Sequence, residues 1–356
     1  MRTANAFDLL TDDDTWGIQI RQGYQSATSG SETEAAVFGV NGSIDWLLQG
    51  FYNDSKDIRV GNGDKIPYSG LTQRGGLVKL GWQIDDSQRL SLSYRETISK
   101  QLAPTNNDME APYPVKDLIQ AVGKCHLNMG TMMQCYKGLL GSLGSAAELA
   151  RQKITDRSVQ LNYSLNPDSK YIDTQFTLYH NNTKELEDQI DNDLHDTTKF
   201  STWGFNLRNS SAFDYITLTY GVDYYQDKAK TFRQTNQTEA GLFRPNSYNA
   251  QSDVVGTYLL SYIPMFNDKL VLSPRIRYDN YRSKEKNQGN YSEHRWSPSL
   301  ALLWKATDWL DLSARYNEAF RAPSLQEKFT SGNHFGYSSR GRATSNKFIS
   351  NPNFET

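Results

Sequence analysis

Residues 269–283, KLVLSPRIRYDNYRS, alternate between apolar and polar side chains along most of their length. Leu270 and Ile276 share one parity, whereas Arg275 and Arg277 share the other. Successive side chains of a β-strand point to opposite faces, so this stretch predicts a strand with one apolar and one polar face. It is longer than the about five or six residues of an ordinary strand, and a tilted strand needs only about ten residues to cross a bilayer. The stretch is therefore typical of a strand in the wall of a membrane barrel.

The same alternation recurs along the chain and predicts thirteen strands. They span about residues 14–27, 34–41, 43–53, 74–85, 88–99, 152–165, 170–183, 199–210, 214–228, 251–264, 269–283, 291–305 and 309–322. A soluble all-β protein such as a propeller is the alternative, but a propeller should show a repeat of about 40–50 residues with recurring Gly or Trp signatures. The sequence contains no such repeat. We therefore expect an all-β fold, a transmembrane antiparallel β-barrel.

Short and long connections alternate between the predicted strands. Asn41-Gly42 and Asn267-Asp268 are typical of tight hairpin turns. The long polar connections lie at about residues 27–34, 54–73, 100–151, 184–198, 229–250, 284–291 and 323–350. This asymmetry is typical of outer-membrane barrels, in which short turns face the periplasm and long loops lie outside the cell.

The composition agrees with such a barrel and excludes two other classes of protein. The chain has 356 residues, of which 37% are hydrophobic and 12% aromatic, and its mean hydropathy is −0.68. No apolar run approaches the about 18 residues of a membrane-spanning helix, which excludes a helical membrane protein. Bulk nucleic-acid binding requires a positive field, and the formal net charge of −2 excludes a protein of that class. Aromatic residues near strand ends, such as Trp203, Trp296 and Trp304, fit interfacial girdles.

Two features lead us to expect a fragment. Single-chain bacterial barrels have an even number of strands, whereas the pattern predicts thirteen. No apolar stretch of signal-peptide length follows Met1, although a protein that crosses the inner membrane should carry one. We therefore expect residues 14–356 to form part of a barrel wall rather than a closed barrel.

The longest predicted loop, residues 100–151, contains both cysteines of the chain. Its residues 115–122 have the apolar spacing of a short amphipathic helix. In an oxidising compartment, Cys125 and Cys135 predict a disulfide. The alternative is a soft-metal site, because a histidine and three methionines lie beside the thiols, although their spacing matches no recognised zinc pattern. These neighbours are His126, Met129, Met132 and Met133.

The residues do not form a recognisable catalytic set. A barrel-borne protease or lipase would need a Ser/His/Asp or paired-acid set at the rim. His180 falls on the lipid-facing parity of its strand, near the outer end, and His195 and His294 have no obvious partner. The acidic stretch 185–196 could invite calcium, but it lacks the glycine of a calcium-binding loop, and a charged external loop is the simpler interpretation. We therefore expect neither catalysis nor a catalytic cofactor.

The last predicted connection carries the most specific signal. A Phe-Arg-Ala-Pro motif precedes it, an Asn-Pro-Asn-Phe motif closes it, and a His-Phe pair lies between them. The residues are Phe320, Arg321, Ala322 and Pro323, then His334 and Phe335, then Asn351, Pro352, Asn353 and Phe354. This arrangement resembles the TonB-dependent haem and haemoglobin receptors of the Gram-negative outer membrane, and it is most similar to their haemophore-receptor branch. The family usually has leucine where this chain has Phe354.

The resemblance implies a domain organisation. Arg2-Thr3 followed by Asp8-Leu9-Leu10 is similar to the family's junction between plug domain and barrel. Residues 1–13 are then the end of the plug, residues 14–356 a partial barrel, and the Phe-Arg-Ala-Pro strand the thirteenth of the family's twenty-two. The resemblance places the signal peptide, the TonB box, the plug and about nine strands outside this sequence. The family's second haem-coordinating histidine, which the plug carries, lies outside it too.

The resemblance also implies roles for residues of the last connection. His334 is expected to coordinate the haem iron, because a neutral imidazole is a good axial ligand. Phe335 and Tyr337 would contact the porphyrin, and basic residues would meet its propionates. These basic residues are Arg340, Arg342 and Lys347. Pro323 is expected to end the last strand, with Arg321 facing the lumen, and no metal is expected beyond haem iron.

The sequence therefore suggests an outer-membrane receptor that binds haem and imports it. Haemoglobin or a haemophore would dock on the external loops, the TonB complex would supply energy, and outer-membrane lipid would surround the barrel. One alternative is a TonB-dependent siderophore or cobalamin receptor, which does not need His334. An alternative from another class is an outer-membrane enzyme or a passive porin.

Overall fold

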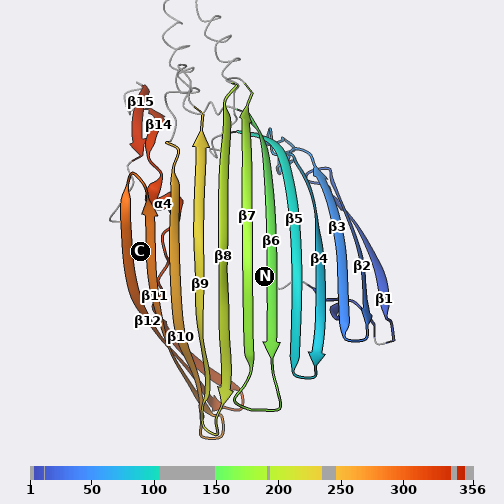
Figure 1. The fold of residues 1–356 in the computed structure, drawn as a ribbon, viewed down its shortest axis with the longest axis vertical. Helices are drawn as coiled ribbons and strands as arrows, with labels where there is room; N and C mark the ends of the chain where they lie inside the picture. Colours follow the sequence, from blue (N-terminus) through green and yellow to red (C-terminus); the bar gives the residue numbers. More distant parts are fainter. Residues whose placement is uncertain are drawn as a thin grey trace, which may run out of the picture.

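The computed structural model describes residues 4–11, 13–104, 149–190, 193–234, 246–337 and 343–348. Thirteen antiparallel strands form one sheet, in which each strand pairs with its neighbours in sequence (Figure 1). The strands are β1 (Trp16–Gln25), β2 (Gly30–Asn41), β3 (Ile44–Ser55), β4 (Leu71–Asp85), β5 (Gln88–Pro104), β6 (Leu149–Leu165), β7 (Thr174–Gln189), β8 (His195–Ala212), β9 (Thr217–Arg233), β10 (Asn249–Met265), β11 (Leu270–Glu285), β12 (Gly289–Thr307) and β13 (Leu310–Asn317). The predicted strand number and the antiparallel arrangement are therefore confirmed.

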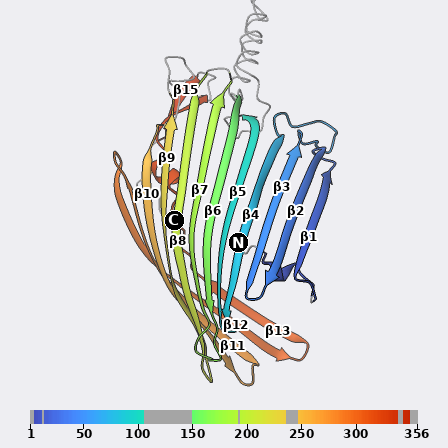
Figure 2. The ribbon, with the colours of Figure 1, turned by 45° about the vertical axis from the view of Figure 1, so that its right-hand side comes forward.

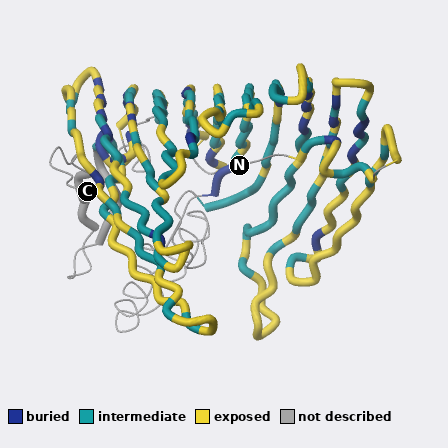
Figure 3. The backbone as a smooth tube through the Cα atoms, turned by 90° about the horizontal axis from the view of Figure 1, so that it is seen from below, coloured by how far each residue is buried: buried dark blue, intermediate teal, exposed yellow. Residues whose placement is uncertain are grey.

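The sheet is curved and twisted into an open wall (Figure 2). Seen from below, it forms a trough (Figure 3). β1 and β13 are the first and last strands of the sheet, and within the described residues each pairs on one side only. The wall is thus part of a barrel. The described residues include no helix that is long and apolar enough to span a membrane.

Period-two alternation sorts the side chains of the wall onto two faces. Leu80 of β4 and Leu92 of β5 are in register, and both are exposed on the convex face. The neighbouring pair in the ladder, Lys79 and Ser93, lies on the concave face and is buried. An exposed apolar face and a buried polar face are the reverse of a soluble protein. This distribution suits a wall that has lipid outside and a polar lumen inside.

Aromatic rings contact each other across strands of the convex face. The ring of Trp203 in β8 lies 5.0 Å from that of Tyr224 in β9, in an edge-on arrangement. The rings of Tyr278 in β11 and Trp296 in β12 are 4.8 Å apart. Such amphipathic rings favour the boundary between lipid and water, so these pairs mark the level of an interfacial girdle.

The strands extend further toward the long-loop rim than the sequence pattern predicts. The predicted charged loop over residues 184–198 was wrong, because β7 continues to Gln189 and β8 begins at His195. Glu187 and Asp196 are directly opposite each other in this hairpin. A strand that extends beyond the membrane has water on its outer side, so polar residues on both faces remain compatible with it. The acidic residues of this stretch therefore suggested a loop where the structure has strands.

Gly204 of β8 allows a close approach between neighbouring strands. A Cβ atom at this position would lie 2.4 Å from the carbonyl oxygen of Tyr224 and 2.7 Å from the hydroxyl of Tyr179. We expect Gly204→Ala to lower the free energy of unfolding of the intact protein by about 1–3 kcal/mol, because the neighbouring strand must move. The thermal midpoint measures this change. Gly50→Ala is the matched control, since its nearest neighbouring atom is 3.9 Å away, and equal midpoint shifts for the two variants would contradict the prediction.

The segment before β1 lies on the concave face of the wall (Figure 3). Its 3-10 turn, η1 (Ala6–Asp8), buries Ala6 in a cluster with Phe38 of β2. The ammonium group of Lys79 in β4 donates a hydrogen bond to the carbonyl oxygen of Ala4 at 3.3 Å. Apolar and polar contacts thus hold this segment inside the trough.

Candidate functional site

The segment after β13 leaves the wall earlier than the sequence predicts. β13 ends at Asn317, so the prediction that the last strand reaches residue 322 was wrong. The amide of Glu318 still donates to the carbonyl oxygen of Pro298 in β12, at 3.0 Å. Pro323 has no amide hydrogen to offer a neighbouring strand, and the chain continues into a short helix, α4 (Leu325–Phe329). The Phe-Arg-Ala-Pro motif is therefore a connection between wall and helix.

Arg321 of this motif binds the first turn of α4. Both of its terminal nitrogens donate to the carboxylate of Glu327, at 2.9 and 3.0 Å. The same carboxylate accepts the amide of Ser324 at 2.8 Å, and the Ser324 hydroxyl accepts the amide of Glu327 at 3.2 Å. This reciprocal pair is a capping box that satisfies two amides at the helix start. The expectation that Arg321 belongs to the end of the last strand was wrong, because β13 has already ended at Asn317.

The donors around Glu327 keep its carboxylate ionised. The Arg321 guanidinium, followed by the Ser324 amide, lowers the pKa of Glu327 to about 2 from an ordinary value of 4.5. A carboxylate with a lowered pKa in the folded state stabilises that state above its unfolded pKa and loses the effect as the pH falls through the folded pKa. The cap of α4 is therefore complete above about pH 5 and weakens toward about pH 2. Glu327 is about one-third exposed, so solvent screening keeps its contribution small.

Apolar contacts fasten α4 to the wall. Leu325 and Phe329 are buried in a cluster with Ala229 of β9 and Ala250 of β10. The ring of Phe329 also lies 5.8 Å from that of Tyr291 in β12. Small residues on the two strands leave room for the helix, which therefore lies against the strand ends near the long-loop rim (Figure 1).

Polar contacts reinforce this attachment. Lys328 is fully buried, and its ammonium group lies 3.2 Å from the carboxylate of Glu293 and 5.1 Å from the ring centre of Tyr291. The side-chain amide of Gln288 donates to the carbonyl oxygen of Phe329 at 2.9 Å. A buried ammonium group is tolerated only when it is paired. The helix is thus held in one position on β12 as well as on β9 and β10.

A two-stranded hairpin follows α4 and contains the predicted haem ligand. It consists of β14 (Gly332–Tyr337) and β15 (Ala343–Phe348). His334 lies in β14 directly opposite Asn346, and Lys347 of β15 is opposite Asn333. Phe335 also belongs to β14. Residues 323–350 therefore carry a helix and a hairpin rather than a plain coil.

Other predicted site residues lie outside the part of the chain that the structure describes. They are Arg340, Arg342, Asn351, Pro352 and Asn353 of the last connection, together with Cys125, Cys135 and the predicted helix 115–122. The haem contacts of these residues and the disulfide remain predictions. Within the described residues, no group of three or more His, Cys, Asp or Glu side chains could hold a metal ion.

The other described histidines lie on strands of the wall. His195 was expected to lack a partner, but its Nδ1 lies 2.7 Å from the carboxylate of Asp188, because β7 and β8 extend far enough to bring the two together. His180 is exposed on the parity that faces lipid, as the alternation predicts. The ring of His294 lies 6.2 Å from that of Tyr278 on β11.

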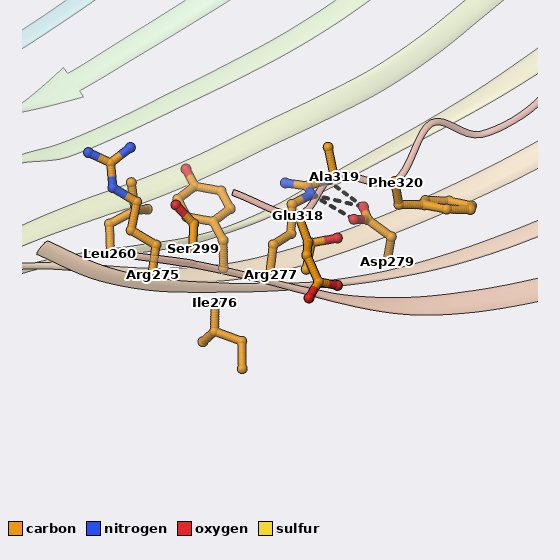
Figure 4. Close-up of a pocket in the computed structure, with 11 residues that line it drawn as sticks. Leu260, Arg275, Ile276, Arg277, Asp279, Ser299, Glu318, Ala319 and Phe320 are labelled. Carbon is orange, nitrogen blue, oxygen red and sulfur yellow. Dashed lines mark hydrogen bonds and ion pairs between the residues drawn. The ribbon is translucent and has the colours of Figure 1, made fainter. Parts of the chain in front are cut away.

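A hollow of about 420 Å³ lies between the concave face of β10–β12 and the segment after β13 (Figure 4). Arg277 forms its polar centre. The Arg277 guanidinium donates to the carboxylate of Asp223 at 2.8 and 2.9 Å and to that of Asp279 at 2.7–2.9 Å. Arg275 and Phe320 also line the hollow. The structure thus brings the Phe-Arg-Ala-Pro motif against a charged network that the sequence pattern did not indicate.

Comparison with known sequences identifies related proteins along the whole chain. The family described as TonB dependent receptor-like, beta-barrel, matches residues 136–356, which is more than half of the chain. Heme/hemopexin utilization protein C of Haemophilus influenzae (strain 86-028NP) is 44% identical over 361 residues, which cover 99% of this chain and 51% of the relative. The Hemin receptor of Yersinia enterocolitica is 24% identical over a stretch that covers 99% of this chain and 46% of that relative. The chain therefore spans about half the length of the curated relatives it matches.

Solved structures share the same fold. A double mutant of the Serratia marcescens hemophore receptor HasR, in complex with its hemophore HasA and heme, matches with a TM-score of 0.70 and 19% identity over 99% of this chain and 51% of that chain. The FrpB iron transporter of Neisseria meningitidis (F5-1 variant) matches with a TM-score of 0.69 and 21% identity, over 90% of this chain and 49% of that chain. The chain therefore belongs to the TonB-dependent receptor family, and its thirteen strands are part of the β-barrel with which these receptors cross the outer membrane of Gram-negative bacteria.

Proposed function

We propose that this chain is the barrel part of a receptor that binds haem at the cell surface and imports it. The observation that carries the proposal is the 44% identity, over 99% of the chain, to a heme/hemopexin utilization protein. The hemin receptors that match at lower identity support the same class of ligand. The receptor transports its ligand without cleaving a bond, so it needs no catalytic cofactor.

His334 is the proposed axial ligand of the haem iron. Its place in β14, in a hairpin that starts shortly after the anchored helix α4, supports this role. A ligand residue must be held in position to bind tightly, and the contacts of α4 restrict the start of the hairpin. Phe335 and Tyr337 are proposed to contact the porphyrin, and Arg340, Arg342 or Lys347 to meet its propionates.

The proposed haem source is a carrier protein that docks on the external loops. Haemoglobin and a haemophore fit the resemblance, and the name of the Haemophilus influenzae relative adds hemopexin. Energy for import would come from the TonB complex. The long connection between β5 and β6 includes Cys125 and Cys135, whose proposed disulfide would stabilise this docking surface.

Residues 1–13 are proposed to be the end of a plug domain. The burial of Ala6 on the concave face and the hydrogen bond from Lys79 to Ala4 support this assignment, because a plug fills the inside of a barrel. Relatives about twice as long as this chain support a longer receptor, in which further strands close the wall between β13 and β1. Closure would satisfy the edge strands in lipid.

The test is growth of a haem-requiring Gram-negative strain that lacks its own haem receptors and expresses the full-length receptor. We expect growth on haem only when the receptor and TonB are both present, and a Soret absorbance change when the purified receptor meets haem. Growth that persists without TonB would indicate a passive porin instead. Binding of a ferric siderophore in place of haem would indicate the siderophore alternative.

A further inference from the structure

A row of lysines crosses three strands on the convex face of the wall. Lys184 of β7 is directly opposite Lys199 of β8, and Lys199 is directly opposite Lys230 of β9. All three side chains are exposed. Like charges directly opposite each other on neighbouring strands destabilise a sheet. A row of three therefore calls for an anionic partner that offsets the repulsion.

The protein does not supply this partner within the described residues. The ion pairs of β7, β8 and β9 use other side chains, namely Asp188 with His195, Asp196 with Arg233, and Asp223 with Arg277. Lys228, two residues from Lys230 and on the same face, is also exposed and extends the row. We call Lys184, Lys199, Lys228 and Lys230 the lysine row.

The same strands carry their acidic side chains mainly on the opposite face. Glu185 of β7, Asp196 of β8 and Asp227 of β9 have the parity of the concave face, and Asp196 is almost completely buried. The chain as a whole has a net charge of only −2. The lysine row is therefore positive because these strands place basic and acidic side chains on different faces. It does not follow from a basic composition.

The distance of the lysine row from the aromatic girdle shows which part of the membrane surrounds it. Lys199 lies four residues beyond Trp203 on the same face of β8, which at about 3.4 Å per residue is about 14 Å along the strand. A strand tilt of about 40° reduces this to about 10 Å along the membrane normal. Phe205 and Leu207, on the other side of Trp203, continue the face as apolar wall. The lysine row therefore lies just outside the aromatic girdle, at the level of lipid headgroups on the long-loop side.

We propose that the lysine row binds the phosphate groups of the glycolipid that forms the outer leaflet of the membrane. A phosphate monoester carries a charge of about −1.5 to −2 near neutral pH, and lysine ammonium groups are common ligands for it. Neighbouring strands are about 4.8 Å apart, so adjacent lysines can share one phosphate. A haem-carrying protein fits this position less well, because the row lies at the membrane surface rather than on the external loops. The proposal rests on the membrane location of the barrel and not on haem transport.

The test compares two double variants of the full-length receptor purified in detergent. Lys199→Gln with Lys230→Gln removes two members of the row. Lys269→Gln with Lys305→Gln removes two exposed lysines at the short-turn rim, one in the turn before β11 and one on β12, whose backbones share a 2.8 Å hydrogen bond. The probe is bisphosphorylated lipid A, with dephosphorylated lipid A as the second arm, and native mass spectrometry measures how much remains bound.

The parent receptor and the Lys269/Lys305 variant are expected to retain bisphosphorylated lipid A equally. The Lys199/Lys230 variant should bind it about tenfold more weakly, because each lysine near an anionic surface adds to the affinity. Dephosphorylated lipid A should bind all three proteins equally. Without lipid A, the Lys199/Lys230 variant should be at least as heat-stable as the parent, since it has lost the repulsion, which also shows that it folds.

Equal retention of bisphosphorylated lipid A by the two double variants would overturn the proposal. Equal binding of the phosphorylated and dephosphorylated forms by the parent would overturn it as well. Weaker binding of haemoglobin by the Lys199/Lys230 variant, with lipid A binding unchanged, would assign the row to a protein partner instead.

Discussion

His334→Ala in the full-length receptor is expected to weaken haem binding by at least about tenfold, because the change removes the proposed axial ligand of the iron. The methyl group of alanine has no lone pair, so the iron would keep at most one protein ligand at this site. A titration of the purified receptor followed by Soret absorbance measures the affinity. The position of the Soret band reports the iron ligand independently of how much haem is bound.

His180→Ala is the matched control for this experiment. His180 lies on the exposed convex face of β7, on the opposite side of the wall from the segment after β13. Its loss should change neither the affinity for haem nor the Soret band. If His334→Ala also leaves both unchanged, the iron has other ligands, and a siderophore-type receptor becomes the better explanation.

Arg277→Met is expected to lower the free energy of unfolding of the full-length receptor by about 2–3 kcal/mol. The substitution leaves the carboxylates of Asp223 and Asp279 without their shared cation, and Asp279 is almost completely buried. Breaking a fully buried pair costs about 3–5 kcal/mol, and we discount that range because Arg277 is itself about one-third exposed. The temperature at which the folded barrel loses its fast mobility in a heated detergent gel measures the change.

Arg275→Met provides the control for Arg277→Met. Arg275 has the same parity on β11 and lines the same hollow, but it is exposed (Figure 4). Its substitution should leave the transition temperature within experimental error. Adding Asp223→Asn and Asp279→Asn to Arg277→Met should restore most of the lost stability, since no unpaired carboxylate then remains. Equal losses for Arg275→Met and Arg277→Met would show that the charge network is not the cause.

The wall was predictable because each strand has lipid on one face and a polar lumen on the other. Apolar and polar residues therefore alternate along its sequence. Leu80 against Lys79 shows the principle, since the apolar residue is exposed and the polar one buried. The pattern failed where the surroundings change. Beyond the girdle both faces meet water, so residues 184–198 resembled a loop although most of them continue β7 and β8.

The site was predictable only in part. His334 could be chosen because the motifs on either side of it are specific, whereas α4 has five residues and shows no helical periodicity. The pair Ser324 and Glu327 has the spacing of a capping box and was the available signal for that helix. The charge network of Arg277 could not be predicted from the sequence. Its partner Asp223 is 54 positions away, and only the strand register brings the two together.

The strictly sequential order of the thirteen strands bears on how such receptors diverge. Each strand pairs only with its neighbours in the chain, so the connection between two strands affects the wall only through the entropy of closing that connection. This penalty grows slowly, by about 0.6 kcal/mol for each doubling of length. The connection between β5 and β6 can therefore be far longer than that between β11 and β12 with little effect on the strands that it joins. Evolution can lengthen, shorten or exchange the cell-surface segments under pressure from host proteins or antibodies, while the registers of the wall stay as they are.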